Sequence, residues 1–180
     1  MKIHINKFKQ LDNIEVDLGD VTLLIGGNNA GKSSIIQAIQ FGISVAQATS
    51  LLNNAHWKND KLSTSIGRDE LIYLPIKEVS YLAQNGKLKE GKDNGINIAY
   101  TDNSDQTKIS ISKGRNKNIA IHIEGKTIGE QIQSVEEPFS ILVTGLAGVP
   151  NEEKYQTPFV VKKSAARGDS NSVFRNILLL

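Results

Sequence analysis

Residues 26–33 combine residue types that together bind a polyphosphate. They read Gly-Gly-Asn-Asn-Ala-Gly-Lys-Ser and fit the pattern G-x-x-x-x-G-K-[ST]. Glycine is needed where backbone N–H groups approach phosphate oxygens closely or where φ is positive. Lys32 is expected to reach the β- and γ-phosphates, and the Ser33 hydroxyl to take one coordination site of a Mg²⁺ ion. The alternative is an ordinary glycine-rich turn before a helix, which the flanking residues disfavour.

The residues on either side of this loop predict the elements that position it. Residues 21–25, Val-Thr-Leu-Leu-Ile, form a continuous apolar run, which is typical of a strand buried on both faces. Residues 33–48 are apolar on most faces and predict a helix covered by its neighbours. Such a helix directs the positive end of its dipole at the phosphates. The order of strand, loop and helix indicates an α/β fold of the P-loop NTPase type.

Alternating apolar and polar residues predict further strands, each with one buried face. The alternation occurs twice ahead of the loop, at residues 2–8 and 14–18. It recurs three times in the middle of the chain, where short turns connect the segments, so these predict an antiparallel meander. The three segments are residues 96–100, 108–112 and 119–123, with turns at 102–106 and 114–118.

The remaining segments have weaker patterns. Residues 56–68 are polar and are expected to be irregular, whereas residues 139–143 predict another strand. A loop that contains Gly and Pro is expected at 144–158. Asp169 or Ser170 is the expected N-cap of a final helix.

Composition excludes several classes of protein. The chain has 180 residues, with 21 basic and 19 acidic side chains and a net charge of +2, which argues against a globally basic nucleic-acid coat. Without cysteine there is no disulfide framework, zinc ribbon or thiol catalysis. No apolar run approaches the ~20 residues that a membrane span needs, and the N-terminus has no signal-peptide pattern. We therefore expect a cytoplasmic protein that does not enter a membrane.

The two leading strands and the loop resemble a known group of ATPases. The stretch Ile-Gly-Gly-Asn-Asn-Ala-Gly-Lys-Ser-Ser at 25–34, preceded by two alternating strands, is similar to the ABC-type heads of SMC, DNA-repair and OLD proteins, which are often grouped with the AAA-family ATPases. Residues 143–150 and 166–179 resemble the SMC-like ATPases of bacterial anti-phage systems, including the Septu-type and retron-associated ones. The resemblance implies that residues 1–180 form the first lobe of such a head, with an antiparallel β layer.

The resemblance also implies a role for each residue of the loop. The backbone cradle for ATP would consist of Gly26, Gly27, Asn28, Asn29, Ala30 and Gly31, with Lys32, Ser33 and Ser34 on the phosphates and Mg²⁺. Lys32 would act as the catalytic residue by stabilising the transferred phosphoryl group. Lys9 lies where such heads often place a basic residue near the phosphates, but it also fits a solvated lysine at a strand end.

Several family motifs are missing from the sequence. The Q-loop glutamine is expected within 139–150, where Gly145-Leu146-Ala147-Gly148 stands instead; Gln84 is a substitute whose place before the meander argues against it. No segment has the Walker B pattern of four apolar residues and Asp-Glu, which supplies the metal-holding acid and the general base. There is also no LSGGQ-like signature and no switch histidine. Because the chain ends on apolar residues, we expect it to continue beyond Leu180 into these motifs, and we expect residues 1–180 alone to bind ATP without hydrolysing it.

The resemblance implies partners as well. Two heads would sandwich ATP in a homodimer, and hydrolysis would drive DNA sensing or clamping, or gate a nuclease partner, in anti-phage defence. The alternative is a nucleotide-gated assembly scaffold with little turnover; the ATPase subunit of an ABC transporter is disfavoured by the leading strands and the tail. Residues 112–118 contain three cations and no acid, which fits either contact with DNA phosphate or a solvated hairpin turn.

Overall fold

The chain folds around one antiparallel sheet. The computed structural model describes residues 1–180 except 117, 138 and 144–152. In the described residues, seven strands form a sheet in the order β2-β1-β5-β6-β7-β4-β3, and every neighbouring pair is antiparallel. The strands are β1 (Lys2–Asn6), β2 (Ile14–Asp17), β3 (Trp57–Lys58), β4 (Lys61–Ile66), β5 (Ile96–Asp102), β6 (Asp105–Lys113) and β7 (Ile119–Glu124).

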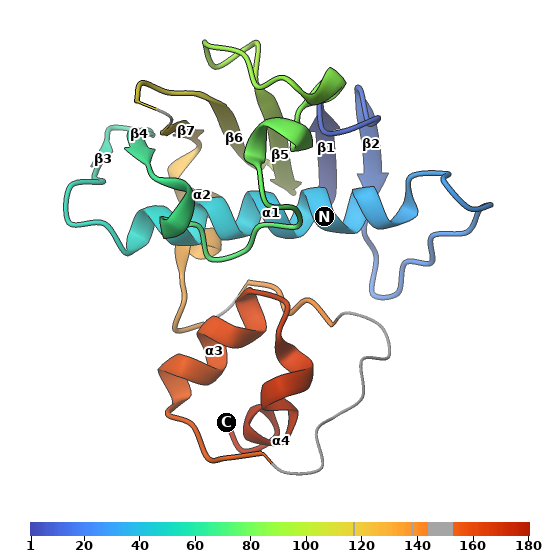
Figure 1. The fold of residues 1–180 in the computed structure, drawn as a ribbon, viewed down its shortest axis with the longest axis vertical. Helices are drawn as coiled ribbons and strands as arrows, with labels where there is room; N and C mark the ends of the chain where they lie inside the picture. The colour runs from blue at the N-terminus through green and yellow to red at the C-terminus, as the bar shows by residue number, and fades with distance from the viewer. Residues whose placement is uncertain (117, 138, 144–152) are drawn as a thin grey trace.

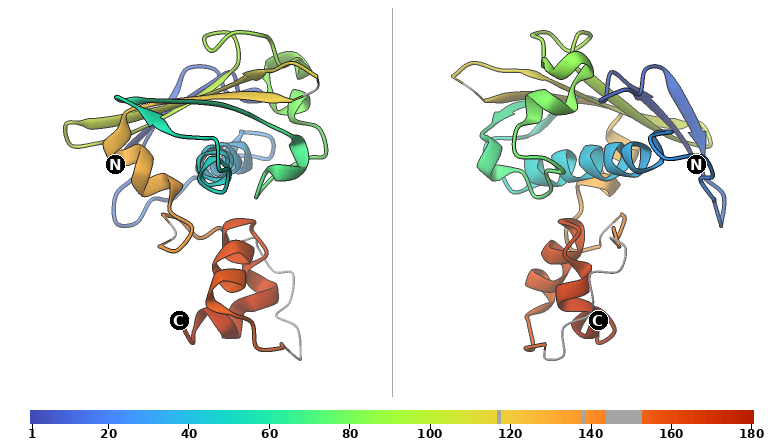
Figure 2. Two further views of the ribbon diagram at one scale, coloured as in Figure 1. Left: turned by 90° about the vertical axis from the view of Figure 1, so that its left-hand side faces the viewer. Right: turned by 45° about the vertical axis from the view of Figure 1, so that its right-hand side comes forward.

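Helices cover one face of this sheet (Figures 1 and 2). The long helix α1 (Lys32–Ser50) crosses the face, and α2 (Lys126–Gln133) packs beside it. A small group of helices lies on the far side of α1 from the sheet: α3 (Pro158–Ala166), the 3₁₀ helix η4 (Ser170–Val173) and α4 (Phe174–Ile177). Gln40 of α1 joins this group through its side-chain amide, which donates to the Ala166 carbonyl at 2.7 Å. Three short 3₁₀ helices lie between β4 and β5: η1 (Arg68–Glu70), η2 (Val79–Leu82) and η3 (Gln84–Gly86).

The core lies between the sheet and α1, as the alternation in the strands predicts. Ile3, Ile5 and Ile98 are fully buried on the face that α1 covers, while polar residues such as His4 alternate with them. Because side chains alternate between the two faces of a strand, a period of two places these isoleucines on the helix side. The predicted strands at 2–8 and 14–18 and the predicted meander are therefore confirmed, with bounds that are shorter or longer by a few residues. The predicted helix at 33–48 is confirmed as α1.

The prediction of a buried strand at 21–25 is wrong. Val21, Leu23 and Ile25 are 91%, 77% and 84% exposed, and the segment has no regular secondary structure. A strand forms when a neighbour satisfies its backbone N–H and C=O groups, and no strand in the described part of the chain pairs with this segment. The chain leaves the sheet after β2, at its edge, and residues 21–25 continue outside it. The apolar residues of 21–25 therefore do not form a strand with any described part of the chain.

The expectation that 56–68 is irregular is also wrong. The hairpin of β3 and β4 lies there, and β4 pairs with β7 along its whole length, from Lys61 opposite Glu124 to Ile66 opposite Ile119. Leu62 and Ile66 are buried in the core, but the position between them is Thr64. With a polar residue at the centre of its apolar face, β4 has a pattern too weak to recognise, and its pairing with β7 holds it in the sheet.

The end of the chain differs from the prediction in two ways. Residues 139–143 form no strand, and Val143 makes only an isolated bridge to Asp169. Asp169 precedes η4 and Ser170 begins it, whereas the N-cap of the last helix, α4, is Val173. The predicted loop at 144–158 lies mostly outside the described residues, and α3 begins at Pro158, where the fixed φ of proline suits the first turn of a helix.

Candidate functional site: the loop at the start of α1

The loop at 26–31 enters α1 through a glycine in the left-handed region. Gly31 has φ 90° and is the N-cap of α1. A Cβ atom at this position would lie 3.3 Å from Cδ2 of Leu11, which is itself part of the core. A side chain at position 31 would therefore be strained by its backbone angle and would crowd the turn after β1. The pattern's second glycine is required here by the fold as well as by the approach of a ligand.

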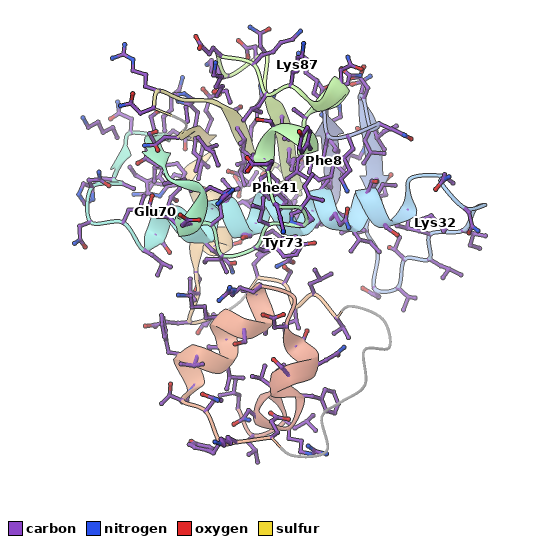
Figure 3. All side chains as sticks on the ribbon, viewed as in Figure 1. Phe8, Lys32, Phe41, Glu70, Tyr73 and Lys87 are labelled. Atoms are coloured by element: carbon purple, nitrogen blue, oxygen red, sulfur yellow. The ribbon has the colours of Figure 1, made fainter. Side chains whose placement is uncertain are left out.

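The N-terminus of α1 has no capping group of its own. No side chain caps it, and its first turn contains no acidic residue. The first helical hydrogen bond closes between the N–H of Ile35 and the carbonyl of Gly31 at 2.9 Å, so the N–H groups of Lys32, Ser33 and Ser34 lie ahead of it. Such N–H groups and the positive end of the helix dipole together attract an anion. The long α1 begins at this loop, where Figure 3 labels Lys32.

Lys32 folds back over the loop. Its ammonium group donates hydrogen bonds to the carbonyls of Gly26 and Gly27, both at 2.7 Å. Charge-assisted hydrogen bonds to phosphate oxygens are stronger than those to neutral carbonyls. The ammonium is therefore held at the loop by contacts that phosphate oxygens can replace.

A pocket of about 610 Å³ lies at this loop. Two residues of its wall, Lys9 and Gln10, come from the turn after β1, far from the loop in sequence. The structure thus brings Lys9 to the loop residues, whereas Gln10 gave no signal in the sequence. The lining residues are Lys9, Gln10, Asn28, Asn29, Ala30, Gly31, Lys32, Ser33 and Ser34.

Lys9 is held at the pocket wall by its backbone and its side chain. It has φ 52°, and its N–H donates to the Leu82 carbonyl at 2.7 Å. Its ammonium donates to Oε1 of Gln37 at 2.6 Å and lies 5.9 Å from the centroid of the Phe8 ring. Partial burial lowers the pKa of Lys9 below the ordinary lysine value. Gln37 follows Ser33 by one helical turn, and sequence reasoning missed it because its partner is distant in the chain.

Of the two other candidates, the structure describes only Gln84, and this residue does not line the pocket. Gln84, weighed as a substitute for the missing Q-loop glutamine, begins η3 and lines a separate pocket with Lys7 and Asn94. The segment Gly145-Leu146-Ala147-Gly148 lies outside the described residues.

The donors of the site fit a magnesium–polyphosphate ligand. In residues 1–116, 118–137, 139–143 and 153–180, no group of three or more His, Asp or Glu side chains is placed to hold a metal ion. Mg²⁺ at protein sites usually keeps several waters and takes one or two protein oxygens beside phosphate oxygens. The Ser33 hydroxyl, exposed at the start of α1, is an oxygen of that kind. The loop thus suits a metal that arrives with its phosphate ligand.

Comparison with known proteins agrees with this geometry. The family model of the AAA ATPase domain matches residues 1–168, which include the loop, all seven described strands and α1 to α3. No curated protein matches the chain. Within the described residues, the helices are too short or too polar to cross a lipid bilayer.

Proposed function

The chain belongs to the AAA ATPase domain family, and from this premise we propose that it binds ATP with Mg²⁺ at residues 26–34. The observation that supports this most is the N-terminus of α1, which has no side-chain cap and no acid and is reached through the left-handed Gly31. The β- and γ-phosphates would replace the carbonyls of Gly26 and Gly27 as partners of the Lys32 ammonium. In this proposal, the pocket performs the nucleotide binding that is expected of an AAA ATPase domain.

Each residue of the pocket has a part in this proposal. Backbone N–H groups from Gly31 to Ser34 bind the phosphate oxygens, and Lys32 neutralises charge on the phosphoryl group that is transferred. The Ser33 hydroxyl would hold the magnesium ion, which would neutralise charge on the phosphates when bound. Lys9 adds a second cation at the wall, where Gln37 orients it.

We further propose that hydrolysis occurs when two copies enclose the nucleotide between them. Ser33, Asn28 and Asn29 are exposed, so the bound phosphates would face outward on this side and a second surface can close over them. The sequence has no Walker B acids to supply the general base. By its resemblance to SMC-like ATPases, the cycle would drive DNA sensing or clamping, or gate a nuclease partner, in cytoplasmic anti-phage defence.

The test is a titration of the full chain with a fluorescent ATP analogue in the presence of Mg²⁺. Lys32→Ala should weaken binding at least about a hundredfold, because it removes the positive charge that contacts the phosphates. Lys58→Ala, which removes an exposed lysine of β3, is the matched control and should bind as the unmodified chain does. Equal affinity in the Lys32→Ala variant would refute the site.

A second candidate function is a nucleotide-gated scaffold that ATP holds together with little turnover. The lack of a Walker B segment in the sequence and of a metal-holding acidic cluster in the described residues favours it for these 180 residues. Phosphate release and sedimentation, measured on the same sample, separate the two. Assembly on ATP without phosphate release supports the scaffold, whereas robust release from this chain alone would contradict the incomplete hydrolytic site.

A further inference from the structure

Three lysines surround a second pocket. This pocket has a volume of about 210 Å³ and lies between the end of β1 and the loop after η3. Its wall contains Lys7, Lys87 and Lys89, several amide side chains, and no acidic residue. In the described part of the chain, none of the three lysines forms an ion pair, and the Lys7 ammonium donates only to the backbone carbonyl of Asp93, at 2.7 Å. Unpaired ammonium groups beside amides are a binding surface for an anion.

The acids near this pocket already have partners. Glu90 lies 3.7 Å from the ammonium of Lys113, and Asp93 lies 3.8 Å from that of Lys108. Both acids make these contacts with lysines outside the pocket wall. Among the described residues, the wall itself has three lysines and no acid, although the whole chain has a net charge of only +2.

The same end of the sheet carries a further cation, Arg115. Asn6 lies opposite Asn97, Ile96 opposite Ile111, and Lys113 opposite Ile119, so the end of β1, the start of β5, the end of β6 and the start of β7 meet at one edge. The hairpin that contains Arg115 follows Lys113 at this same edge. The N–H of Lys113 donates to the Lys89 carbonyl at 2.9 Å, which ties the lysine loop to β6. Arg115 therefore lies at the end of the sheet to which the lysine loop is tied, and cations gathered in this way can bind a phosphate backbone.

An exposed aromatic ring lies next to the lysines. Tyr81 of η2 is 66% exposed, and a Cβ built on Gly86 would lie 3.4 Å from its Cδ1 atom. Gly86 stands between Asn85 and Lys87, both of which line the pocket. The ring therefore lies near Gly86, between two residues of the pocket wall, and stays largely exposed. An aromatic face beside cations is the arrangement on which unpaired bases stack.

We propose that this edge binds single-stranded nucleic acid, with its phosphates at Lys7, Lys87 and Lys89 and one base on Tyr81. Cations alone would suit a duplex equally well, but a ring can stack only on a base that is free of its neighbours. The inference rests on the proposed function only for the part that nucleic acid plays in the ATP cycle. The binding of nucleic acid itself uses no residue of the nucleotide pocket. Lys7 and Lys9 lie two residues apart on the turn that separates the two pockets.

The first experiment tests the lysines. The full chain is titrated into a fluorescein-labelled oligothymidylate of about 15 nucleotides, a length within the range that one such site covers. Lys87→Glu/Lys89→Glu should weaken binding on the order of tenfold and reduce the slope of log affinity against log salt by about 1.4, or about 0.7 for each lost contact. The control, Lys58→Glu/Lys154→Glu, makes the same charge change at exposed lysines of β3 and of the segment before α3. An equal loss in the control would overturn the site.

The second experiment tests the ring. Tyr81→Ala should weaken oligothymidylate binding about tenfold, whereas Tyr81→Phe should keep it, because stacking needs the ring and not the hydroxyl. Tyr155→Ala removes a ring that is 77% exposed elsewhere and should have no effect. Tighter binding to a duplex of the same length, or equal competition by polyglutamate, would contradict a site for single strands.

The two proposals fail separately. ATP affinity measured in the Lys87→Glu/Lys89→Glu variant should be unchanged, and Lys32→Ala should still bind the oligonucleotide. If the unmodified chain binds ATP but no oligonucleotide, this inference is wrong and the nucleotide site stands. If it binds the oligonucleotide but no ATP, the reverse holds.

Discussion

The ammonium of Lys9 donates a hydrogen bond of 2.6 Å to the side-chain oxygen of Gln37. The bond joins the turn after β1 to α1, one helical turn beyond Ser33. It places a cation with a fixed direction at the wall of the nucleotide pocket. Because Gln37 is on the helix whose N-terminus faces the phosphates, Lys9 and the loop keep one relative position.

Removing either partner of this bond should affect nucleotide binding to different degrees. Lys9→Ala deletes a cation beside the phosphates and should weaken ATP binding several-fold, by about 1 kcal/mol. Gln37→Leu keeps the charge but frees the side chain, so its effect should be smaller and should vanish in the Lys9→Ala background. A double-mutant cycle on ATP dissociation constants measures the coupling. If the effects of the two substitutions simply add, Gln37 does not act through Lys9.

The lowered pKa of Lys9 predicts a pH dependence. Lys9 carries its charge below its folded pKa and loses it as the pH rises, and burial places that pKa below the ordinary 10.5. ATP affinity should therefore begin to fall at alkaline pH before an ordinary lysine loses its proton. The Lys9→Arg variant keeps its positive charge at alkaline pH, so its ATP affinity should lack this early fall. The comparison therefore distinguishes deprotonation of Lys9 from deprotonation of Lys32. Titrations from pH 7.5 upward, about half a unit apart, compare the two chains.

The same pKa has the opposite effect on folding. The unfolded chain holds this proton more tightly than the folded one, so the contribution of Lys9 to the free energy of unfolding rises with pH between the lowered pKa and 10.5. Below both values that contribution is constant. Denaturant unfolding of the unmodified chain and of Lys9→Arg measures the free energy of unfolding across this pH window. This free energy should rise with pH only in the chain that has lysine at position 9. The same pH dependence in both chains would contradict the lowered pKa of Lys9.

The close approach of α1 to β5 predicts a compensating pair of substitutions. A Cβ on Gly42 would collide with the hydroxyl of Tyr100, which donates to the Ile39 carbonyl at 2.7 Å in the core. Gly42→Ala should cost about 1–3 kcal/mol through overpacking, and Tyr100→Phe about 1 kcal/mol through the lost hydrogen bond. The double variant should lose less stability than the two single variants lose together, because phenylalanine lacks the hydroxyl oxygen that the new methyl group would meet. Denaturant unfolding of all four chains measures this, and strict additivity would contradict the contact.

The exposure of residues 21–25 predicts that their apolar side chains add little to stability. Leu23→Ser should change the free energy of unfolding by less than about 0.5 kcal/mol, since Leu23 is 77% exposed. Leu82→Ala, at a fully buried position of the core, should cost about 2–5 kcal/mol under the same conditions. A large loss for Leu23→Ser would show that this segment packs against the fold.

Local patterns in the sequence determined the loop, α1 and the meander. The residues of 26–33 are contiguous, and the period-2 alternation of β1, β5, β6 and β7 reflects one face of isoleucines that packs in the core, so both can be recognised without knowing their neighbours. The alternation in β4 is broken by Thr64, and only pairing with β7 makes it a strand. In the described part of the chain, no strand pairs with residues 21–25, and an apolar run alone does not form the backbone hydrogen bonds of a sheet.

The sequence by itself predicted a polyphosphate loop from eight consecutive residues, and the resemblance of that loop and its leading strands to AAA-family ATPases agrees with the family match. Only the tertiary structure decided which distant groups surround the loop. The turn after β1 brings Lys9 to Gln37 and Leu11 against Gly31, and the end of the sheet gathers Lys7, Lys87 and Lys89 around one pocket. These contacts depend on strand order and helix packing, which bring together residues that are far apart in the chain and share no local pattern.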